Sequence, residues 1–207
     1  GCKNNCNRVE IEDFCTQKSC FDEIMLTNFS TKVKQTDKDT LVVMHQTGSH
    51  GPAYFEHYPK EAARWSPVCQ TENFNRCSAA ELINVYDNTI YYTSLFLRKV
   101  IDELTSLSDE YNVALIYASD HGESLGENGI YLHAHPYETA PVYQKKIPLL
   151  IWLPDNSAKA FGLNRNCLKN AAQQPYSHDN LFHSVLGLAG IETIAYTPAL
   201  DIFSGCR

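Results

Sequence analysis

The fold is decided by residues 78–118, which read SAAELINVYDNTIYYTSLFLRKVIDELTSLSDEYNVALIYA. Ser78 and Glu81 form the S-x-x-E pattern of a capping box, in which each side chain bonds the backbone N–H of the other residue. Apolar or threonine residues then recur with helical period from position 82 to position 104, over about six turns. The apolar run VALIYA at 113–118 follows this helix and predicts a buried β-strand.

Two further apolar runs predict strands on either side of this segment. Residues 40–46, TLVVMHQ, precede the helix, and residues 147–153, IPLLIWL, follow the 113–118 run. A strand, a long helix and a second strand imply a crossover connection and a parallel sheet. The sequence therefore predicts an α/β domain, with a mostly parallel sheet flanked by helices and further helices at 21–33 and 178–188.

Length and composition describe one folded domain. The chain has 207 residues, 43% of them apolar, and a net charge of -7. This length can bury a sizeable core, and the negative charge does not favour nucleic acid as a partner. The longest apolar runs are too short to span a bilayer. The chain opens at Gly1 rather than at Met, so we expect it to be part of a longer protein.

Eight cysteines indicate an oxidising compartment. Six lie in close pairs within polar segments and two lie farther along the chain: Cys2/Cys6, Cys15/Cys20 and Cys69/Cys77, then Cys167 and Cys206. An even count in such segments predicts disulfides. The first two pairs could also supply four thiolates to a structural zinc, which is the alternative. Connectivity does not follow from sequence; we expect sequence neighbours to pair, which leaves Cys167 to pair with Cys206.

Polar motifs follow two of the predicted strands, GSHGP at 48–52 and SDHGE at 119–123. Ligands of parallel α/β sheets bind beyond the carboxyl ends of the strands. Asp120 and His121 offer a carboxylate and an imidazole, which are ligand types that zinc accepts. Gly122 permits the unusual backbone that lets both side chains reach one ion. The sequence therefore predicts a metal or phosphate site here, with Asp120 and His121 as metal ligands.

Two more histidines are expected to converge on the same crevice. His50 belongs to the first motif, and His133 lies twelve residues after His121 in a loop that contains glycine. Glu123 and Glu127 are expected to be hydrogen-bonding groups of the loop rather than ligands. The remaining histidines are assigned to solvent-facing, core, loop or helix positions: His135, His45, His57, His178 and His183. A polar loop that binds no metal is the alternative to a metal site.

Four longer motifs occur in order along the chain: HQTGSHGPAYFEHYP, VYDN, YASDHGESLGENGIYLHAHPY and YSHDNLFHSVLGL. Together they resemble the periplasmic domain of bacterial lipid A phosphoethanolamine transferases, the group that includes the colistin-resistance enzymes. This family belongs to the alkaline phosphatase and sulfatase superfamily. The resemblance covers nearly the whole chain, including the paired cysteines, and implies an alkaline phosphatase-like fold stapled by disulfides.

The resemblance implies a zinc enzyme with a threonine nucleophile. In the family, zinc is held by a glutamate, the threonine and an Asp-His pair, which corresponds to Asp120 and His121. The threonine takes phosphoethanolamine from phosphatidylethanolamine, forms a covalent phosphoethanolamine–enzyme intermediate, and passes the group to a lipid A phosphate or a related envelope glycan. His50 and His133 match family histidines that bind the phosphoryl group or a second zinc. Thr47 does not match the nucleophile motif, so we expect the nucleophile upstream of Gly1.

The resemblance also predicts location and partners. Residues 1–207 would be the C-terminal part of a single periplasmic catalytic domain at the inner membrane, monomeric, and joined to an upstream membrane domain. By itself this part would bind zinc weakly and be inactive. One alternative is another enzyme of the superfamily, such as a phosphoglycerol transferase, a phosphatase or a sulfatase. The other is a non-catalytic, disulfide-stapled binding domain.

Overall fold

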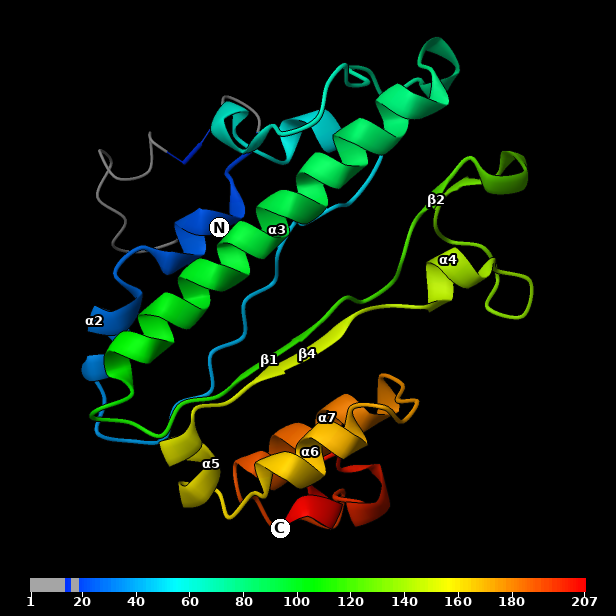
Figure 1. The fold of residues 1–207 in the computed structure, drawn as a ribbon. Helices are drawn as coiled ribbons and strands as arrows, with labels where there is room; N and C mark the ends of the chain where they lie inside the picture. Colours follow the sequence, from blue (N-terminus) through cyan, green and yellow to red (C-terminus); the bar gives the residue numbers. More distant parts are fainter. Residues whose placement is uncertain (1–13, 16–18) are drawn as a thin grey trace. The chain divides into compact units, whose positions relative to one another are not determined.

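The computed structural model describes residues 14–15 and 19–207 (Figure 1). The chain divides into two compact units. The first unit comprises Gly1–Glu103 and His121–Ile147, and the second comprises Leu104–Asp120 and Pro148–Arg207. The long helix α3, Ala79–Leu107, begins in the first unit and ends in the second.

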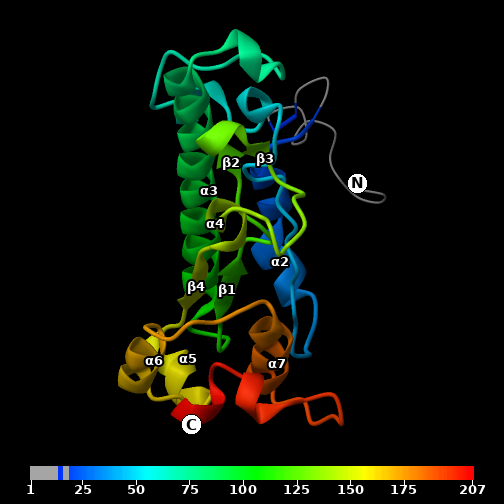
Figure 2. The ribbon, with the colours of Figure 1, turned by 90° about the vertical axis from the view of Figure 1, so that its right-hand side faces the viewer.

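Short helices and loops pack against the buried face of α3 in the first unit. Its elements are η1 (Asp22–Leu26), α2 (Phe29–Lys34), η2 (Tyr54–Glu56), η3 (Lys60–Ala62), η4 (Phe74–Arg76), β2 (Ser124–Leu125), η5 (Glu127–Gly129), β3 (Tyr131–Leu132) and α4 (Val142–Lys145). Leu82 and Val85 of α3 are buried in one cluster with Tyr54 and Tyr58 of the preceding loops. Figure 2 shows these segments along α3.

The capping box predicted at the start of α3 is present. The backbone N–H of Ser78 donates to the Glu81 carboxylate at 2.8 Å, and the backbone N–H of Glu81 donates to Ser78 Oγ at 3.3 Å. The bond from the Ser78 backbone N–H, together with one from the Ser78 hydroxyl to the same carboxylate at 2.8 Å, lowers the pKa of Glu81. The predicted helix is confirmed, and its buried face repeats every three or four residues, as the period requires.

Asn88, the last residue of the VYDN motif, is a buried polar residue of this helix. Its side chain is completely buried, and its Oδ1 accepts hydrogen bonds from the backbone N–H groups of Arg64 and Trp65 at 2.8 and 2.9 Å. Its Nδ2 donates to the Trp65 carbonyl at 3.0 Å. A buried amide is stable only when its donors and acceptor are used, so Asn88 ties the irregular 53–77 segment to α3.

The second unit contains one strand pair and several helices. Strand β1 (Leu115–Ala118) pairs with β4 (Leu149–Trp152), with Leu115 opposite Trp152 and Ala118 opposite Leu149. The helices that follow are α5 (Asp155–Ala160), α6 (Arg165–Ala171), α7 (Asp179–Leu188), η6 (Pro198–Leu200) and η7 (Ser204–Cys206). Ala158 of α5 and Phe203, which directly precedes η7, are buried in one core, and Ile116 and Ile151 of the strands pack against it.

The predicted parallel pairing is wrong for the described strands. β1 and β4 are antiparallel, and so are β2 and β3. Residues 40–46 form no ladder within residues 14–15 and 19–207, and Leu41 and Val43 are 71% and 82% exposed. An apolar run becomes a strand only when a neighbouring strand satisfies its backbone groups. The apolar pattern contains no information on which neighbour that is or on its direction.

The predicted disulfide pairing is confirmed for every cysteine that the structure describes. Cys15 bonds Cys20, Cys69 bonds Cys77, and Cys167 bonds Cys206. The expected Cys2–Cys6 pair lies outside the described residues. The thiols of Cys15 and Cys20 are used in a disulfide, so that pair does not bind a structural zinc. Among the described helices, none is both long enough and apolar enough to cross a membrane.

Candidate metal and phosphoryl site

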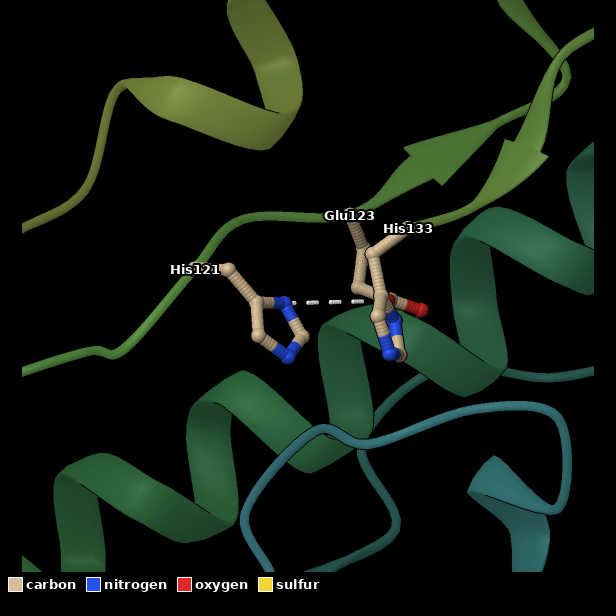
Figure 3. A group of neighbouring side chains, drawn as sticks. All are labelled: His121, Glu123 and His133. Carbon is tan, nitrogen blue, oxygen red and sulfur yellow. Dashed lines mark hydrogen bonds and ion pairs between the residues drawn. The ribbon is translucent and has the colours of Figure 1, made fainter. Parts of the chain in front are cut away.

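Three side chains of the first unit come together beside the β2–β3 hairpin: His121, Glu123 and His133 (Figure 3). Each offers a ligand atom, and these atoms lie within 4.8 Å of one another. Glu123 directly precedes β2 and His133 directly follows β3. Ser124 pairs with Leu132 in the antiparallel ladder. The residues next to this pair, Glu123 and His133, therefore lie on neighbouring segments of the chain.

A tight turn joins β2 to β3. Gly126 and Gly129 have φ angles of +114° and +76°, a region that glycine adopts without steric cost. The carboxylate of Glu127 accepts a hydrogen bond from the backbone N–H of Leu125 at 2.7 Å. The prediction that Glu127 is a hydrogen-bonding group of the loop is therefore confirmed.

Helix α4 holds the segment that contains His121 and Glu123 through hydrogen bonds of Gln144. The backbone N–H of Gly122 donates to the Gln144 carbonyl at 3.0 Å, and a Cβ at position 122 would overlap the carbonyl oxygen of Tyr143. The buried side chain of Gln144 donates to Ser124 Oγ and to the Leu132 carbonyl, both at 3.0 Å. Gly122 is thus required because its segment lies against the backbone of α4. The unusual backbone predicted at Gly122 is not observed, since its φ is not among the positive values.

Glu123 is the buried centre of the group. One carboxylate oxygen accepts a hydrogen bond from the Tyr54 hydroxyl and the other accepts one from Nδ1 of His133. Burial, together with the hydrogen bond to Glu123, raises the pKa of Tyr54 far above its usual value, so the hydroxyl remains a donor. The hydrogen-bonding role predicted for Glu123 is confirmed, but its buried position between Tyr54 and His133 was not predicted from the sequence. In an extended chain residues i and i+2 share a face, and this spacing relates His121 to Glu123.

The hydrogen bonds define the tautomers of two histidines. Nδ1 of His121 lies 3.0 Å from the Gly122 carbonyl oxygen, and Nδ1 of His133 contacts the Glu123 carboxylate. A carbonyl or a carboxylate can only accept, so each Nδ1 carries a proton. Nε2 is then the nitrogen that can bind a metal through its lone pair when the ring is neutral, or donate to a phosphoryl oxygen when the ring is protonated. A ligating histidine commonly has this arrangement, with its other nitrogen bonded to a carboxylate or carbonyl. Glu123 therefore suits an orienting role as well as that of a ligand.

His50 joins the two histidines, as predicted. Its ring centroid lies 5.0 Å from that of His133 and 6.3 Å from that of His121, while the His121 and His133 rings stack at 3.9 Å. The buried carboxylate of Asp22 holds the preceding loop, because it accepts hydrogen bonds from the backbone N–H groups of Thr47 and Gly48 at 2.8 and 3.0 Å. No sequence motif marked Asp22 as a residue of this site.

Asp120 belongs to the second unit, two residues after β1, and its side chain is exposed. The preceding carbonyl, that of Ser119, accepts a hydrogen bond from Nε2 of His178 at 2.8 Å. His178 thus supports the end of β1 from the residue directly before α7. The pairing of Asp120 with His121 as zinc ligands stays a prediction.

The other histidines have structural or solvent positions. His135 is exposed, as predicted, whereas His45 is exposed rather than in the core because residues 40–46 have no ladder partner in the described chain. Burial lowers the pKa of His57. His183 accepts a hydrogen bond at Nδ1 from the backbone N–H of Thr197 at 3.0 Å.

The donor set fits a divalent metal ion. Imidazole nitrogens and a carboxylate are ligands of zinc and other transition metals. Zinc–nitrogen bonds of about 2.0 Å bring tetrahedral ligands to within roughly 3.5 Å of one another. Ligand atoms within 4.8 Å of one another therefore need only small side-chain movements to surround an ion. The group can hold a metal, and histidine N–H groups beside it can bind a phosphoryl oxygen.

Comparison with known proteins identifies the family. The sequence model of the sulfatase family matches residues 2–191. The chain therefore belongs to the sulfatase family, which confirms the superfamily and the alkaline phosphatase-like fold expected from its motifs.

Similar proteins narrow the comparison to phosphoethanolamine transferases. The chain is 41% identical over 216 residues to phosphoethanolamine transferase EptA of Escherichia coli, a match that covers all of this chain and 40% of EptA. It is 39% identical to the integral membrane lipooligosaccharide phosphoethanolamine transferase A of Neisseria meningitidis, with a TM-score of 0.91 over 100% of this chain and 40% of that one. The soluble domain of the Neisseria enzyme gives a TM-score of 0.88 at 39% identity, over 96% of this chain and 60% of that domain.

Proposed function

We propose that the protein containing this chain transfers phosphoethanolamine from phosphatidylethanolamine to a lipid A phosphate or a related envelope glycan. The observation that carries this proposal is the convergence of His50, His121 and His133, with ring centroids 3.9 to 6.3 Å apart. The three histidines come from the motifs that resemble the transferase family. The names of the similar proteins support the same activity.

Zinc is the metal we propose for the site, held by Asp120 and His121 together with groups from outside this chain. When bound, it would lower the pKa of a coordinated hydroxyl and neutralise charge on the phosphoryl oxygens. His121 is oriented for this by its Nδ1–H bond to the Gly122 carbonyl. His50 and His133 would bind the phosphoryl oxygens, or a second metal with Glu123.

The reaction we propose has two displacements. A threonine outside this chain loses its hydroxyl proton and forms a bond to phosphorus, while the bond from phosphorus to the diacylglycerol oxygen breaks and diacylglycerol leaves with a proton. An oxygen of the lipid A phosphate then gives up its proton and forms the new bond to phosphorus, and the threonine oxygen leaves and is protonated again. Hydrogen bonds from histidines to the phosphoryl oxygens are strongest in the transition state, where charge develops.

Location and organisation are part of the same proposal. The chain spans 40% of the E. coli relative and 60% of the Neisseria soluble domain. We propose that residues 1–207 form the C-terminal part of one periplasmic catalytic domain, as the resemblance of their motifs implies. The complete protein would be a monomer at the periplasmic face of the inner membrane, where both lipids are available.

The proposal is tested with the complete protein in detergent. Purified protein is incubated with labelled phosphatidylethanolamine and lipid A, and mass spectrometry detects lipid A that has gained phosphoethanolamine. Transfer that is lost in His121→Ala supports the proposal. A second candidate, hydrolysis of a sulfate ester, is favoured by the family match. Release of sulfate from an aryl sulfate without transfer to lipid A would replace the proposed function by a sulfatase, and zinc binding without either activity would favour a binding domain.

A further inference from the structure

We infer that Tyr54 is a positioning residue of this site. Its hydroxyl holds the Glu123 carboxylate, and through that carboxylate it sets the orientation and tautomer of His133. The inference rests on the proposed function in one respect: it takes His133 to bind the phosphoryl group or a second metal. No capping, core or loop pattern in the sequence identifies Tyr54.

The hydroxyl of Tyr54 has little freedom to move. The side chain is 1% exposed, its ring stacks on Phe74 with centroids 5.9 Å apart, and it meets the ring of Tyr86 edge-on at 5.5 Å. A Cβ at Gly51 would lie 2.7 Å from the hydroxyl oxygen. The backbone at Gly51 therefore approaches the Tyr54 hydroxyl, and packing on both sides of the ring directs that hydroxyl at Glu123.

The carboxylate of Glu123 is held from two sides. Its side chain is 3% exposed, and each oxygen accepts a hydrogen bond, one from Tyr54 and one from His133. A buried carboxylate is tolerated when its oxygens are hydrogen-bonded. With both oxygens used, rotation of the carboxylate would break two bonds at once, so its plane is fixed.

The fixed carboxylate decides which nitrogen of His133 faces the other histidines. Glu123 accepts a hydrogen bond from Nδ1–H, which leaves Nε2 of His133 available to the group formed with His50 and His121. Removing the Tyr54 hydroxyl leaves one carboxylate oxygen without its donor. The carboxylate can then rotate, and the preference of His133 for the Nδ1–H tautomer weakens.

The first experiment replaces Tyr54 by phenylalanine in the complete protein labelled with ¹⁵N-histidine. Ring nitrogen shifts of His133, assigned with a His133→Gln variant, report its tautomer. We expect a single Nδ1–H tautomer in the unchanged protein and averaged shifts in Tyr54→Phe. The matched control is Tyr58→Phe, because Tyr58 lies in the same core cluster but bonds Asn88 Nδ2 at 3.2 Å. It should leave the His133 shifts unchanged.

The second experiment is a double-mutant cycle of Tyr54→Phe and Glu123→Gln. Loss of a group that orients a ligand typically costs about 10- to 100-fold in activity or metal affinity, so we expect Tyr54→Phe to lower the transfer rate about tenfold. In the Glu123→Gln background the same change should cost less than about twofold, since residues in one network are not additive.

Three results would overturn the inference: His133 shifts in Tyr54→Phe identical to those of the unchanged protein, an equal change in Tyr58→Phe, or additive effects in the cycle. The tautomer readout requires neither metal nor turnover. An inactive protein in which Tyr54→Phe still alters the His133 tautomer would refute the transfer proposal and leave the role of Tyr54 standing. An active protein in which Tyr54→Phe leaves the His133 tautomer unaltered would support the transfer proposal and refute the role of Tyr54.

Discussion

Glu123 and His133 lie ten residues apart in the chain, yet one hydrogen bond joins them in the buried part of the site. A carboxylate in this position selects the histidine tautomer, because it accepts a hydrogen bond from the ring nitrogen that carries the proton. The same logic applies to His121, which donates to the Gly122 carbonyl. The chemistry of the site thus depends on acceptors beside the histidines as much as on the histidines.

Histidine substitutions should separate metal binding from phosphoryl binding. We expect Asp120→Ala or His121→Ala to abolish zinc content and transfer together in the complete protein, because both are assigned to the metal. His50→Ala or His133→Ala should lower transfer by about 100-fold, the typical cost of losing one donor to a developing negative charge, with zinc retained. Metal analysis by mass spectrometry and a transfer assay measure the two effects.

His135→Ala is the matched control for these variants, since His135 lies in the same loop with an exposed side chain. It should keep both zinc and activity. Unchanged transfer in both the His50 and the His133 variants would contradict the assignment of these residues to binding of the phosphoryl group.

Gly122→Ala should damage the site through the backbone. The added Cβ would overlap the Tyr143 carbonyl oxygen, and overpacking of this kind costs about 1–3 kcal/mol. We expect a loss of that size in the free energy of unfolding, measured by urea denaturation. Gly205→Ala is the control, because its Cβ would meet no atom within 4 Å. Equal stability of the two variants would contradict the close approach.

At the scale of the element, the start of α3 offers a direct test of the capping box. Ser78→Ala removes the acceptor for the Glu81 backbone N–H, and loss of such a cap costs about 1 kcal/mol. The measurement is the free energy of unfolding in urea. Ser94→Ala is the control: it removes an exposed serine inside the same helix that donates only to the Tyr91 carbonyl. The cap assignment fails if both variants are equally stable.

The capping box should also respond to pH. Hydrogen bonds donated by the backbone N–H and the hydroxyl of Ser78 lower the pKa of the Glu81 carboxyl in the folded protein, and Ser78→Ala removes the hydroxyl donor. A lowered carboxyl pKa contributes stability above the unfolded pKa, and this contribution is lost as the pH falls through the folded pKa. The difference in stability between Ser78→Ala and the unchanged protein should therefore shrink on acidification. A difference that grows as the pH falls would reverse this linkage.

At the scale of the whole molecule, the disulfides differ in how much chain they close. Cys167 and Cys206 are 39 residues apart, whereas Cys69 and Cys77 are 8 apart. Chain entropy predicts about 4 kcal/mol for the longer loop and about 2.5 kcal/mol for the shorter. We expect Cys167→Ser/Cys206→Ser to lower the free energy of unfolding more than Cys69→Ser/Cys77→Ser. The reverse order in denaturant titrations would show that packing rather than loop closure dominates.

The sequence by itself determined the features that depend on near neighbours. The cap and period of α3 follow from residues 78–104, and short-range pairing predicted the Cys15–Cys20 and Cys69–Cys77 disulfides. The sequence motifs also predicted that His50, His121 and His133 lie together, and their rings are neighbours in the structure. Helical period and loop closure act over a few turns of chain, so local pattern contains the information.

Only the tertiary structure decided the features that depend on distant partners. The direction of β4 against β1, the absence of a ladder at residues 40–46 in the described chain, and the bond from Tyr54 to Glu123 are of this kind. A strand's apolar pattern is the same for a parallel or an antiparallel neighbour, and a buried tyrosine has the same local sequence whether or not its hydroxyl meets a carboxylate. Residues 69 positions apart are joined by packing, which no local pattern encodes.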